Sequence, residues 1–269
     1  MTIVNVQTTT EKLLVQKEGP IGWITFNNPA RHNAVSMSMW ESIPGALKVF
    51  EDDPEIRLVV LRGAGEKAFI SGADISEFKE KRSGKEATDA YNAAGDAANR
   101  ALQEFSKPLI AMIRGYCIGG GCGVALACDL RIAADDSVYS IPAGRLGLGY
   151  RYEGIRRLVD VVGPSFATEI FFTARKFNGQ EALSMGLINR LVPAGELESF
   201  VRGYAATIAD NAPLTLKAVK RCVLERAKDA EVRNLKVCKE LVDACFASKD
   251  YEEGRTAFME KRRPVFRGV

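Results

Sequence analysis

The sequence contains a single histidine, His32, among its 269 residues, and its six cysteines form no Cys-x-x-Cys pair. Zinc sites in proteins are built mainly from clusters of these two residue types, so the sequence argues against a metal centre. Cysteines without a pairing pattern are interpreted most simply as reduced thiols, which are typical of cytoplasmic proteins. We therefore expect a cytoplasmic protein that holds no metal ion.

Long apolar runs and charged blocks are also missing. No stretch reaches the ~20 apolar residues that a membrane-spanning helix needs, and the segment MTIVNVQTTTEKLL has no charged region followed by an apolar core, as a signal peptide would. Lys and Arg (37) outnumber Asp and Glu (34) by only three. The one dense basic run, KRRP at residues 261–264, is interpreted as a solvated tail. Neither a membrane nor a nucleic acid is an expected partner.

Strand and helix patterns alternate through most of the chain. Continuous apolar runs predict buried strands, and apolar residues at helical spacing predict the helices between them. In chain order these are a hairpin of LLVQ and IGWITFN, a helix at 36–52, a strand at 56–63, a helix at about 88–105 and a strand at 109–113. Ser36 or Ser38 is the expected cap of the first helix. Both faces of the IGWITFN strand are expected to be covered, because its polar and apolar residues do not alternate cleanly.

From about residue 194 the pattern becomes helical alone. Four helical segments follow with few strand signals, and one of them begins at Pro213, since the first turn of a helix tolerates proline. We therefore predict an α/β core over residues 1–193 and a helical region over residues 194–269.

Two glycine-rich turns follow predicted strands, GAGEKAFISGADI at residues 63–75 and GYCIGGGCGVALACDL at residues 115–130. GAGEKA matches the dinucleotide-binding pattern G-x-G-x-x-A, but it runs into the extended FISG and not into a helix. No acidic ribose partner follows about twenty residues on, and the Lys-Ser or Lys-Thr of a P-loop is absent. Nucleotide-binding loops are therefore disfavoured.

An anion site is the stronger chemical interpretation of these turns. Glycines before a helix let a carbonyl oxygen approach the first backbone N–H groups, which have no internal acceptors and carry the positive end of the helix dipole. An N–H group from the other turn would complete a two-donor oxyanion hole. On spacing alone, it is equally well supported that the glycines only permit close packing of strand on helix.

Five segments carry recognisable motifs in order: NNPARHNAVS, AFISGADI, GYCIGGGCGVALACDLRIAA, ARKFNGQEALSMGLINRLVP and AFMEKRRPVF. They resemble segments of the crotonase family, also called the enoyl-CoA hydratase/isomerase family. The resemblance implies an α/β spiral of strand-strand-helix units with a C-terminal helical trimerisation region, and hence a homotrimer or homohexamer. It also implies acyl-CoA thioester substrates, with coenzyme A as part of the substrate and no separate cofactor.

The resemblance also assigns roles by position in these motifs. The oxyanion-hole donors would be the N–H groups of Ala73 and Gly120. Coenzyme A would contact two short segments, which are Ala30, Arg31 and His32, and Ala73, Asp74 and Ile75. His32 is interpreted as a loop residue and not as a base, because no partner is visible to orient it. Asp74 is interpreted as an acceptor for local backbone amides.

The sequence departs from the hydratases of this family at both of their acid–base glutamates. The first belongs directly after GGGC, where this chain has Gly123, and the second belongs directly after a proline, where it has Ala143. Neither side chain can exchange a proton, so two-glutamate hydration is not expected. Candidate substitutes are Tyr150, Tyr152 and Glu153, although Glu153 is equally well interpreted as an acid in the first turn of a helix.

These roles predict an acyl-CoA enzyme of the lyase or isomerase type that stabilises a thioester enolate in the Ala73/Gly120 oxyanion hole. Two alternatives stay open: an acyl-CoA-binding protein without catalysis, and a decarboxylase or ring-modifying enzyme of the same family. A nucleophilic Cys122, at a helix start that would stabilise a thiolate, is less favoured than a small buried Cys122 side chain.

Overall fold

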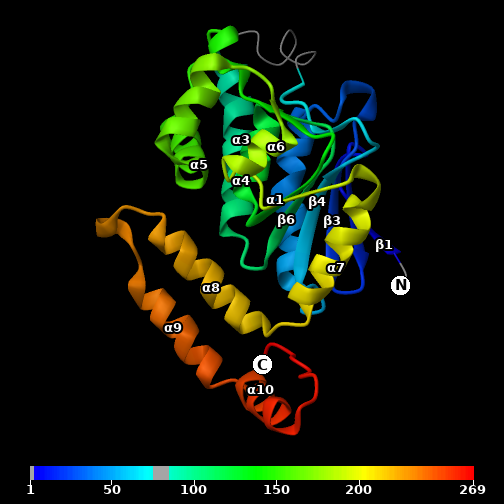
Figure 1. Cartoon of the computed structure of the whole chain (residues 1–269), viewed down its shortest axis with the longest axis vertical. Helices are drawn as coiled ribbons and strands as arrows, with labels where there is room; N and C mark the ends of the chain where they lie inside the picture. The colour runs from blue at the N-terminus through cyan, green and yellow to red at the C-terminus, as the bar shows by residue number, and fades with distance from the viewer. Residues whose placement is uncertain (1–2, 75–84) are drawn as a thin grey trace.

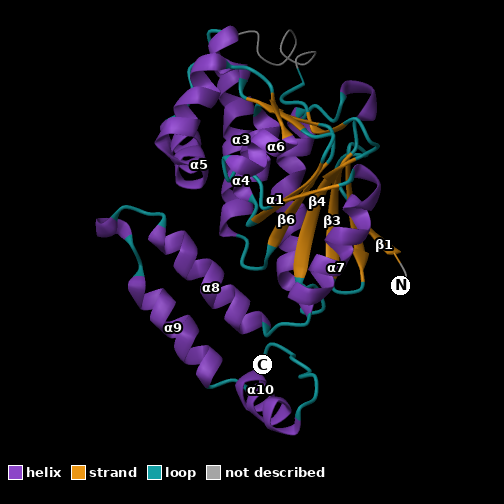
Figure 2. Cartoon of the chain, viewed as in Figure 1, coloured by secondary structure: helices purple, strands orange, loops and turns teal. Residues whose placement is uncertain are grey.

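Two β-sheets form the scaffold of the computed structural model, which describes residues 3–74 and 85–269 (Figure 2). Within these ranges the larger sheet has seven strands in the order β1-β2-β3-β4-β6-β8-β11, and the smaller sheet has four in the order β10-β9-β7-β5. The strands are β1 (Ile3–Val6), β2 (Leu13–Glu18), β3 (Ile21–Phe26), β4 (Leu58–Gly63), β5 (Ala68–Ile70), β6 (Leu109–Ile113), β7 (Tyr116–Ile118), β8 (Leu130–Ala134), β9 (Val138–Ser140), β10 (Phe177–Asn178) and β11 (Arg190–Val192).

Successive turns of the chain each add one strand to the larger sheet, one strand to the smaller sheet and then a helix (Figure 1). β4, β6 and β8 run parallel in the larger sheet, and β5, β7 and β9 run parallel in the smaller sheet. The helices are α1 (Met37–Asp52), α3 (Lys85–Glu104), α4 (Gly120–Ala127), α5 (Tyr152–Thr173), α6 (Gly179–Ser184), α7 (Leu197–Ala209), α8 (Pro213–Arg226), α9 (Leu235–Phe246) and α10 (Lys249–Glu260). The predicted spiral of strand-strand-helix units is confirmed.

Both faces of the larger sheet are covered, as the patterns of its strands predict. Every residue of β3 is buried. Ile24 and Phe26 belong to the main core with α1, whereas Ile21 and Trp23 pack in a second cluster with residues of α7. Successive side chains of a strand point to opposite faces, so a strand covered on both sides needs apolar residues at consecutive positions.

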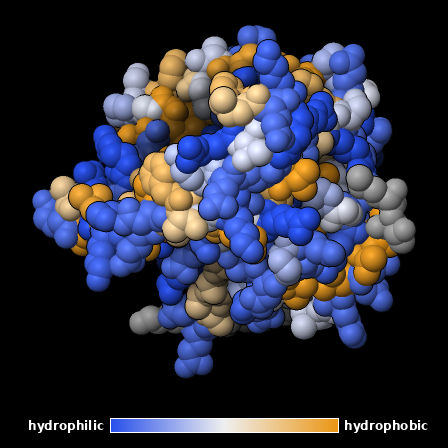
Figure 3. Space-filling model, turned by 90° about the horizontal axis from the view of Figure 1, so that it is seen from below, coloured by the Kyte–Doolittle hydropathy of each residue, from blue (hydrophilic) through white to orange (hydrophobic). Residues whose placement is uncertain are grey.

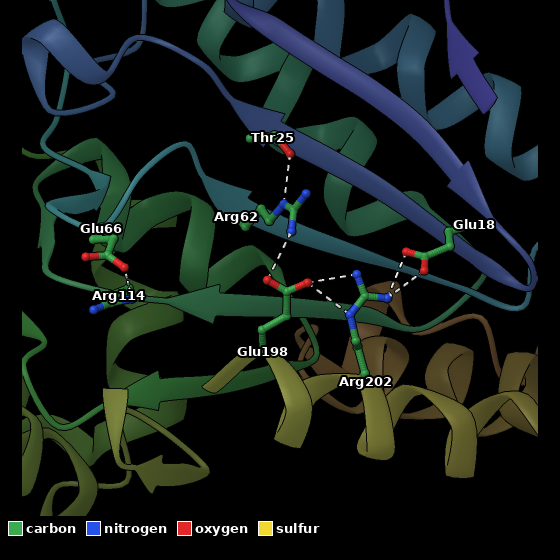
Figure 4. A network of polar contacts seen from close by, with 7 residues as sticks. All are labelled: Glu18, Thr25, Arg62, Glu66, Arg114, Glu198 and Arg202. Atoms are coloured by element: carbon green, nitrogen blue, oxygen red, sulfur yellow. Dashed lines mark hydrogen bonds and ion pairs between the residues drawn. The ribbon is translucent and has the colours of Figure 1, made fainter. Parts of the chain in front are cut away.

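Charged residues fix α7 on the outer face of the sheet (Figure 4). Arg202 of α7 binds both carboxylate oxygens of Glu18 at 2.8 Å and also pairs with Glu198. The guanidinium groups of Arg62 and Arg202 lie 4.6 and 4.9 Å from the centre of the Trp23 ring. The buried indole is therefore enclosed by two cations whose charges are balanced by glutamates.

The predicted helices are observed with small shifts at their ends. The first begins after Ser36, whose hydroxyl accepts the Met39 N–H (3.3 Å), so Ser36 is the cap. The second, expected at about 88–105, is α3 over Lys85–Glu104. Pro213 is the first residue of α8. No helix in the described part of the chain is long and apolar enough to cross a bilayer.

The last three helices extend from one end of the core (Figure 1). The ammonium group of Lys220, on α8, donates to Lys107 O and to the carboxylate of Asp129, both at 2.8 Å. Arg57 donates to Phe266 O (2.9 Å), which joins the C-terminal segment to the core. α7 also follows residue 193 but packs on the sheet, so the division at 193/194 stays a prediction.

Glu225 holds the connection between α8 and α9. Its side chain is 1% exposed, and its carboxylate accepts the Asn234 N–H (2.8 Å) and pairs with Lys228 (2.8 Å) and Arg221 (2.7 Å). These contacts, led by the hydrogen bond from Lys228, lower the pKa of Glu225 from 4.5 to about 2. The ionised carboxylate is therefore part of the folded turn.

The Glu225→Gln variant tests this role through pH. A carboxyl whose pKa is lower in the folded than in the unfolded chain adds stability above its ordinary pKa, and this stability is lost as the pH falls. We expect the variant to have a lower urea midpoint at neutral pH, and the difference from the parent protein to shrink between pH 4.5 and about 2. Glu240→Gln, in an exposed pair with Lys236, is the control with little expected effect. A difference that does not change with pH would contradict this role.

Candidate active site

Ala73 is positioned by a short parallel pairing with Val35. The N–H of Val35 donates to Gly72 O (2.8 Å), and the N–H of Asp74 donates to Val35 O (3.0 Å). The Gly72 carbonyl and the Ala73 N–H belong to one planar trans peptide, so they point in opposite directions. The N–H of Ala73 therefore points away from Val35.

Gly120 is the first residue of α4, so its N–H belongs to the first turn, where no carbonyl lies one turn earlier to accept it. The preceding Gly119 has a φ of +54°, which favours glycine, and its N–H donates to Ser140 O (2.8 Å). A Cβ atom placed on Gly120 would lie 3.9 Å from both the Cα and the carbonyl carbon of Gly72. The two segments that carry the predicted donors therefore lie side by side.

The other glycines of α4 differ in what surrounds them. A Cβ on Gly121 would lie 2.3 Å from the Ile70 carbonyl oxygen, so this position cannot carry a side chain. A Cβ on Gly123 would have no heavy atom of the described residues within 4 Å. Ala143 lies in the 3₁₀ turn Pro142–Arg145, where it is buried and belongs to the main core. Close packing therefore explains Gly121 but not Gly123.

The loop that carries Ala30, Arg31 and His32 is tied to the segment of Ala73. The N–H of Ser71 donates to His32 O (3.1 Å), and the Ser71 hydroxyl donates to Arg31 O (3.2 Å). Ala30, Arg31 and His32 are all exposed. The loop therefore presents an accessible polar edge that is fixed to the backbone next to Ala73.

Asn33 holds this loop in place, and the sequence analysis missed it. Its side chain is 1% exposed, donates to Ala64 O (3.0 Å) and Ala68 O (2.7 Å), and accepts the Asn28 N–H (3.0 Å). Asn33 has a φ of +56°, a conformation that asparagine adopts more readily than most residues. An asparagine directly after a short turn is therefore the signal that could have identified it.

Aromatic and basic side chains lie beside the loop. The His32 ring meets the Tyr116 ring edge to face at a centroid distance of 6.0 Å, and Lys176 Nζ lies 5.2 Å from the centre of the Tyr116 ring. No hydrogen bond orients the His32 ring within the described residues. Asp74 is buried, and Ile75, the last residue of the predicted coenzyme A contact, lies outside the described residues.

Tyr150 packs against the core beside α4. Its ring meets the Phe171 ring at 4.8 Å and covers Gly154, where a Cβ would lie 2.6 Å from the Tyr150 ring. Burial, followed by the influence of the nearby Cys122, raises the pKa of Tyr150 to about 12. The phenol is therefore protonated at physiological pH and is a weaker acid than an exposed tyrosine. Cys122 is buried with its thiol directed at Cys117 O (3.0 Å), which favours a packing role for this cysteine.

Tyr152 and Glu153 lie in a different environment from Tyr150. Tyr152 is 67% exposed and lines a groove with Arg156 and residues 226–231 of the α8–α9 connection. Glu153 is exposed in the first turn of α5, where a carboxylate complements the helix dipole. The structure thus does not bring the three candidate substitutes together.

Comparison with known proteins identifies the family. The enoyl-CoA hydratase/isomerase family profile matches residues 16–269. The chain belongs to the crotonase family. A short-chain-enoyl-CoA hydratase of Clostridium acetobutylicum is 34% identical over 93% of this chain and 95% of its own length. A crotonyl-CoA hydratase of Syntrophomonas wolfei is 33% identical over 95% of this chain and 98% of its own.

Solved structures of the crotonase family share the fold. The crystal structure of an enoyl-CoA hydratase/carnithine racemase from Magnetospirillum magneticum superposes with a TM-score of 0.90 at 32% identity, covering 97% of each chain. Both the core and the C-terminal helices therefore have counterparts in this crotonase structure.

Substitution by alanine should change the free energy of unfolding in opposite directions at Gly121 and Gly123 of α4. Gly121→Ala should lower the free energy of unfolding by about 1–3 kcal/mol, because its methyl group overlaps a backbone oxygen that cannot move freely. Gly123→Ala should raise it by up to about 1 kcal/mol, because alanine is the better helix former and no described residue outside the helix lies within 4 Å of the new methyl group. Chemical denaturation of the two variants checks this, and similar effects in both would contradict it.

Proposed function

We propose that the protein is an enzyme that binds acyl-CoA thioesters and holds the thioester oxygen between the N–H groups of Ala73 and Gly120. The observation that carries this proposal is the side-by-side packing of the two segments. The Ala73 N–H points away from its pairing partner, and the Gly120 N–H lies in the first turn of α4. Two such donors stabilise the negative oxygen of an enolate more than the neutral carbonyl of the substrate.

Coenzyme A would enter as part of the substrate, with no separate cofactor. The exposed loop of Ala30, Arg31 and His32 is fixed next to Ala73, which suits contacts with the adenine and phosphates. His32, Tyr116 and Lys176 add aromatic and basic groups beside it. The contact with Ala73, Asp74 and Ile75 would then direct the thioester toward Gly120.

The reaction differs from two-glutamate hydration. Gly123 and Ala143 stand at the glutamate positions that the resemblance assigns, and neither can move a proton. Among the candidate substitutes, Tyr150 packs against the core, and its pKa is raised to about 12, so its phenol stays protonated and cannot serve as the base. Decarboxylation of a carboxylated acyl-CoA needs no base to form the enolate, so the lack of a carboxylate at positions 123 and 143 makes it the alternative reaction.

An assembly of three or six subunits is proposed through the C-terminal helices. α8, α9 and α10 form an apolar groove lined by Leu214, Val219, Val223, Val242, Phe246 and Phe258. Phe258 is 83% exposed, and hydrophobic side chains reach the surface at this end of the molecule (Figure 3). An exposed apolar groove of this kind favours association with a second copy. The free cysteines suit a cytoplasmic setting.

Gly120→Pro tests the oxyanion assignment, because it removes one N–H while proline is tolerated at the first position of a helix. Exchange of the α-proton of acyl-CoAs in heavy water, or loss of carbon dioxide from a malonyl-type CoA, should slow by ~10²–10³-fold. Gly120→Ala keeps the N–H and places its methyl group at ordinary contact distances, so it is the matched control. Equal rates in both variants would refute the assignment, and tight binding without turnover by the parent protein would support a non-catalytic acyl-CoA-binding protein.

Phe258→Asp tests the assembly. A carboxylate in the apolar groove should shift the protein from trimer or hexamer to monomer in analytical ultracentrifugation, because burying that charge is costly. Val232→Asp is the control, since Val232 is 65% exposed and lies outside the groove. A parent protein that sediments as a monomer would overturn the proposed assembly.

A further inference from the structure

A buried chain of hydrogen bonds reaches the candidate site from two helices. The indole N–H of Trp40, on α1, donates to the hydroxyl of Tyr91, on α3 (3.0 Å). The Tyr91 hydroxyl in turn donates to Val35 O (3.1 Å). Both side chains are only 5% exposed, so water does not compete strongly for these bonds.

Val35 connects the hydrogen bonds of Trp40 and Tyr91 to Ala73, the first of the two predicted oxyanion donors. Its carbonyl oxygen accepts the Tyr91 hydroxyl and also the N–H of Asp74 (3.0 Å). Its N–H donates to the carbonyl of Gly72 (2.8 Å), which belongs to the same peptide unit as the N–H of Ala73. The direction of the Ala73 N–H therefore depends on where Val35 is held.

Trp40 also reaches the second donor. Its Cζ2 atom lies 3.8 Å from the position of a Cβ on Gly120, so the indole packs beside the start of α4. One buried side chain thus contacts the Gly120 segment directly and supports the Ala73 segment through Tyr91 and Val35. Under the proposed function, these two segments carry the two oxyanion donors.

We propose that Trp40 and Tyr91 are positioning residues, which set the direction and separation of the Ala73 and Gly120 N–H groups. This inference rests on the proposed oxyanion hole. Such a site works because its donors are held in place before the charge develops, and buried partners supply that rigidity. Without the Tyr91 hydroxyl, Val35 O would lose one of its two donors and the Trp40 N–H would be left without its acceptor.

Tyr91→Phe tests the proposal, because it removes the hydroxyl and keeps the ring. Raman difference spectra of a bound acyl-CoA with an isotope-labelled thioester carbonyl report how strongly the two N–H groups polarise it. We expect a smaller shift of the carbonyl band than in the parent protein. The kcat for loss of carbon dioxide from a malonyl-type CoA, which forms the enolate without a base, should fall by on the order of 10- to 100-fold, with KM changed less than about twofold, because misplaced donors affect the transition state most.

Tyr139→Phe is the matched control. Tyr139 is 2% exposed, and its hydroxyl donates to Ser137 Oγ (3.1 Å), so the variant also loses one buried tyrosine hydrogen bond. Its carbonyl shift and kcat should equal those of the parent protein. Trp40→Phe, which retains the Tyr91–Val35 hydrogen bond, is the second variant if Tyr91→Phe does not fold, and it should also reduce the carbonyl shift.

The outcomes separate this inference from the proposed function. If the parent protein binds acyl-CoA without polarising its carbonyl, the oxyanion hole itself is wrong. If the parent protein polarises the carbonyl and the folded Tyr91→Phe and Trp40→Phe variants do so equally, with unchanged kcat, the oxyanion hole stands and the positioning role is overturned. A reduced shift in either folded variant, with Tyr139→Phe unchanged, supports the role.

Discussion

The pairing of Val35 with Ala73 is the contact on which the candidate site depends. Its two backbone hydrogen bonds join the loop after β3 to the segment after β5. The strands β3 and β5 themselves belong to separate sheets. The exposed loop of His32 is attached to the same segment through Ser71. The pairing itself is made by backbone groups, so it places the predicted donor segment without a particular side chain at either position.

The larger sheet, from which the Val35 loop leaves, is packed on both of its faces. The larger sheet is packed on one face by the main core with α1 and on the other by α7, whose ion pairs with Glu18 and cation–π contacts with Trp23 fix it at the surface. α1 and α3 then meet through Trp40 and Tyr91, directly behind Val35. The position of Val35 thus depends on contacts between α1 and α3 as well as on its pairing with Ala73.

Much of the fold could be predicted from the sequence, because continuous apolar runs and helical stripes each have one simple structural solution. The β3 strand and the Ser36 cap are examples. The candidate donors came from family motifs, since no local pattern tells which backbone N–H will lack a partner. Tyr91 lies in a predicted helix, but its contact with Trp40 depends on how two helices are rotated against each other. Tyr150 and Tyr152 lie close together in sequence, yet α5 starts between them, so Tyr150 packs against the core and Tyr152 is exposed.

Gly123 differs from Gly119 and Gly121 in how far the described residues restrict it. Gly119 is constrained by its backbone conformation and Gly121 by the oxygen of Ile70, so their identities are dictated by folding. Position 123 is under neither restriction. Among the described residues, position 123 can therefore accept a side chain that position 121 excludes. A larger residue could be introduced there to change the surroundings of the Gly120 N–H while the backbone of α4 keeps its course.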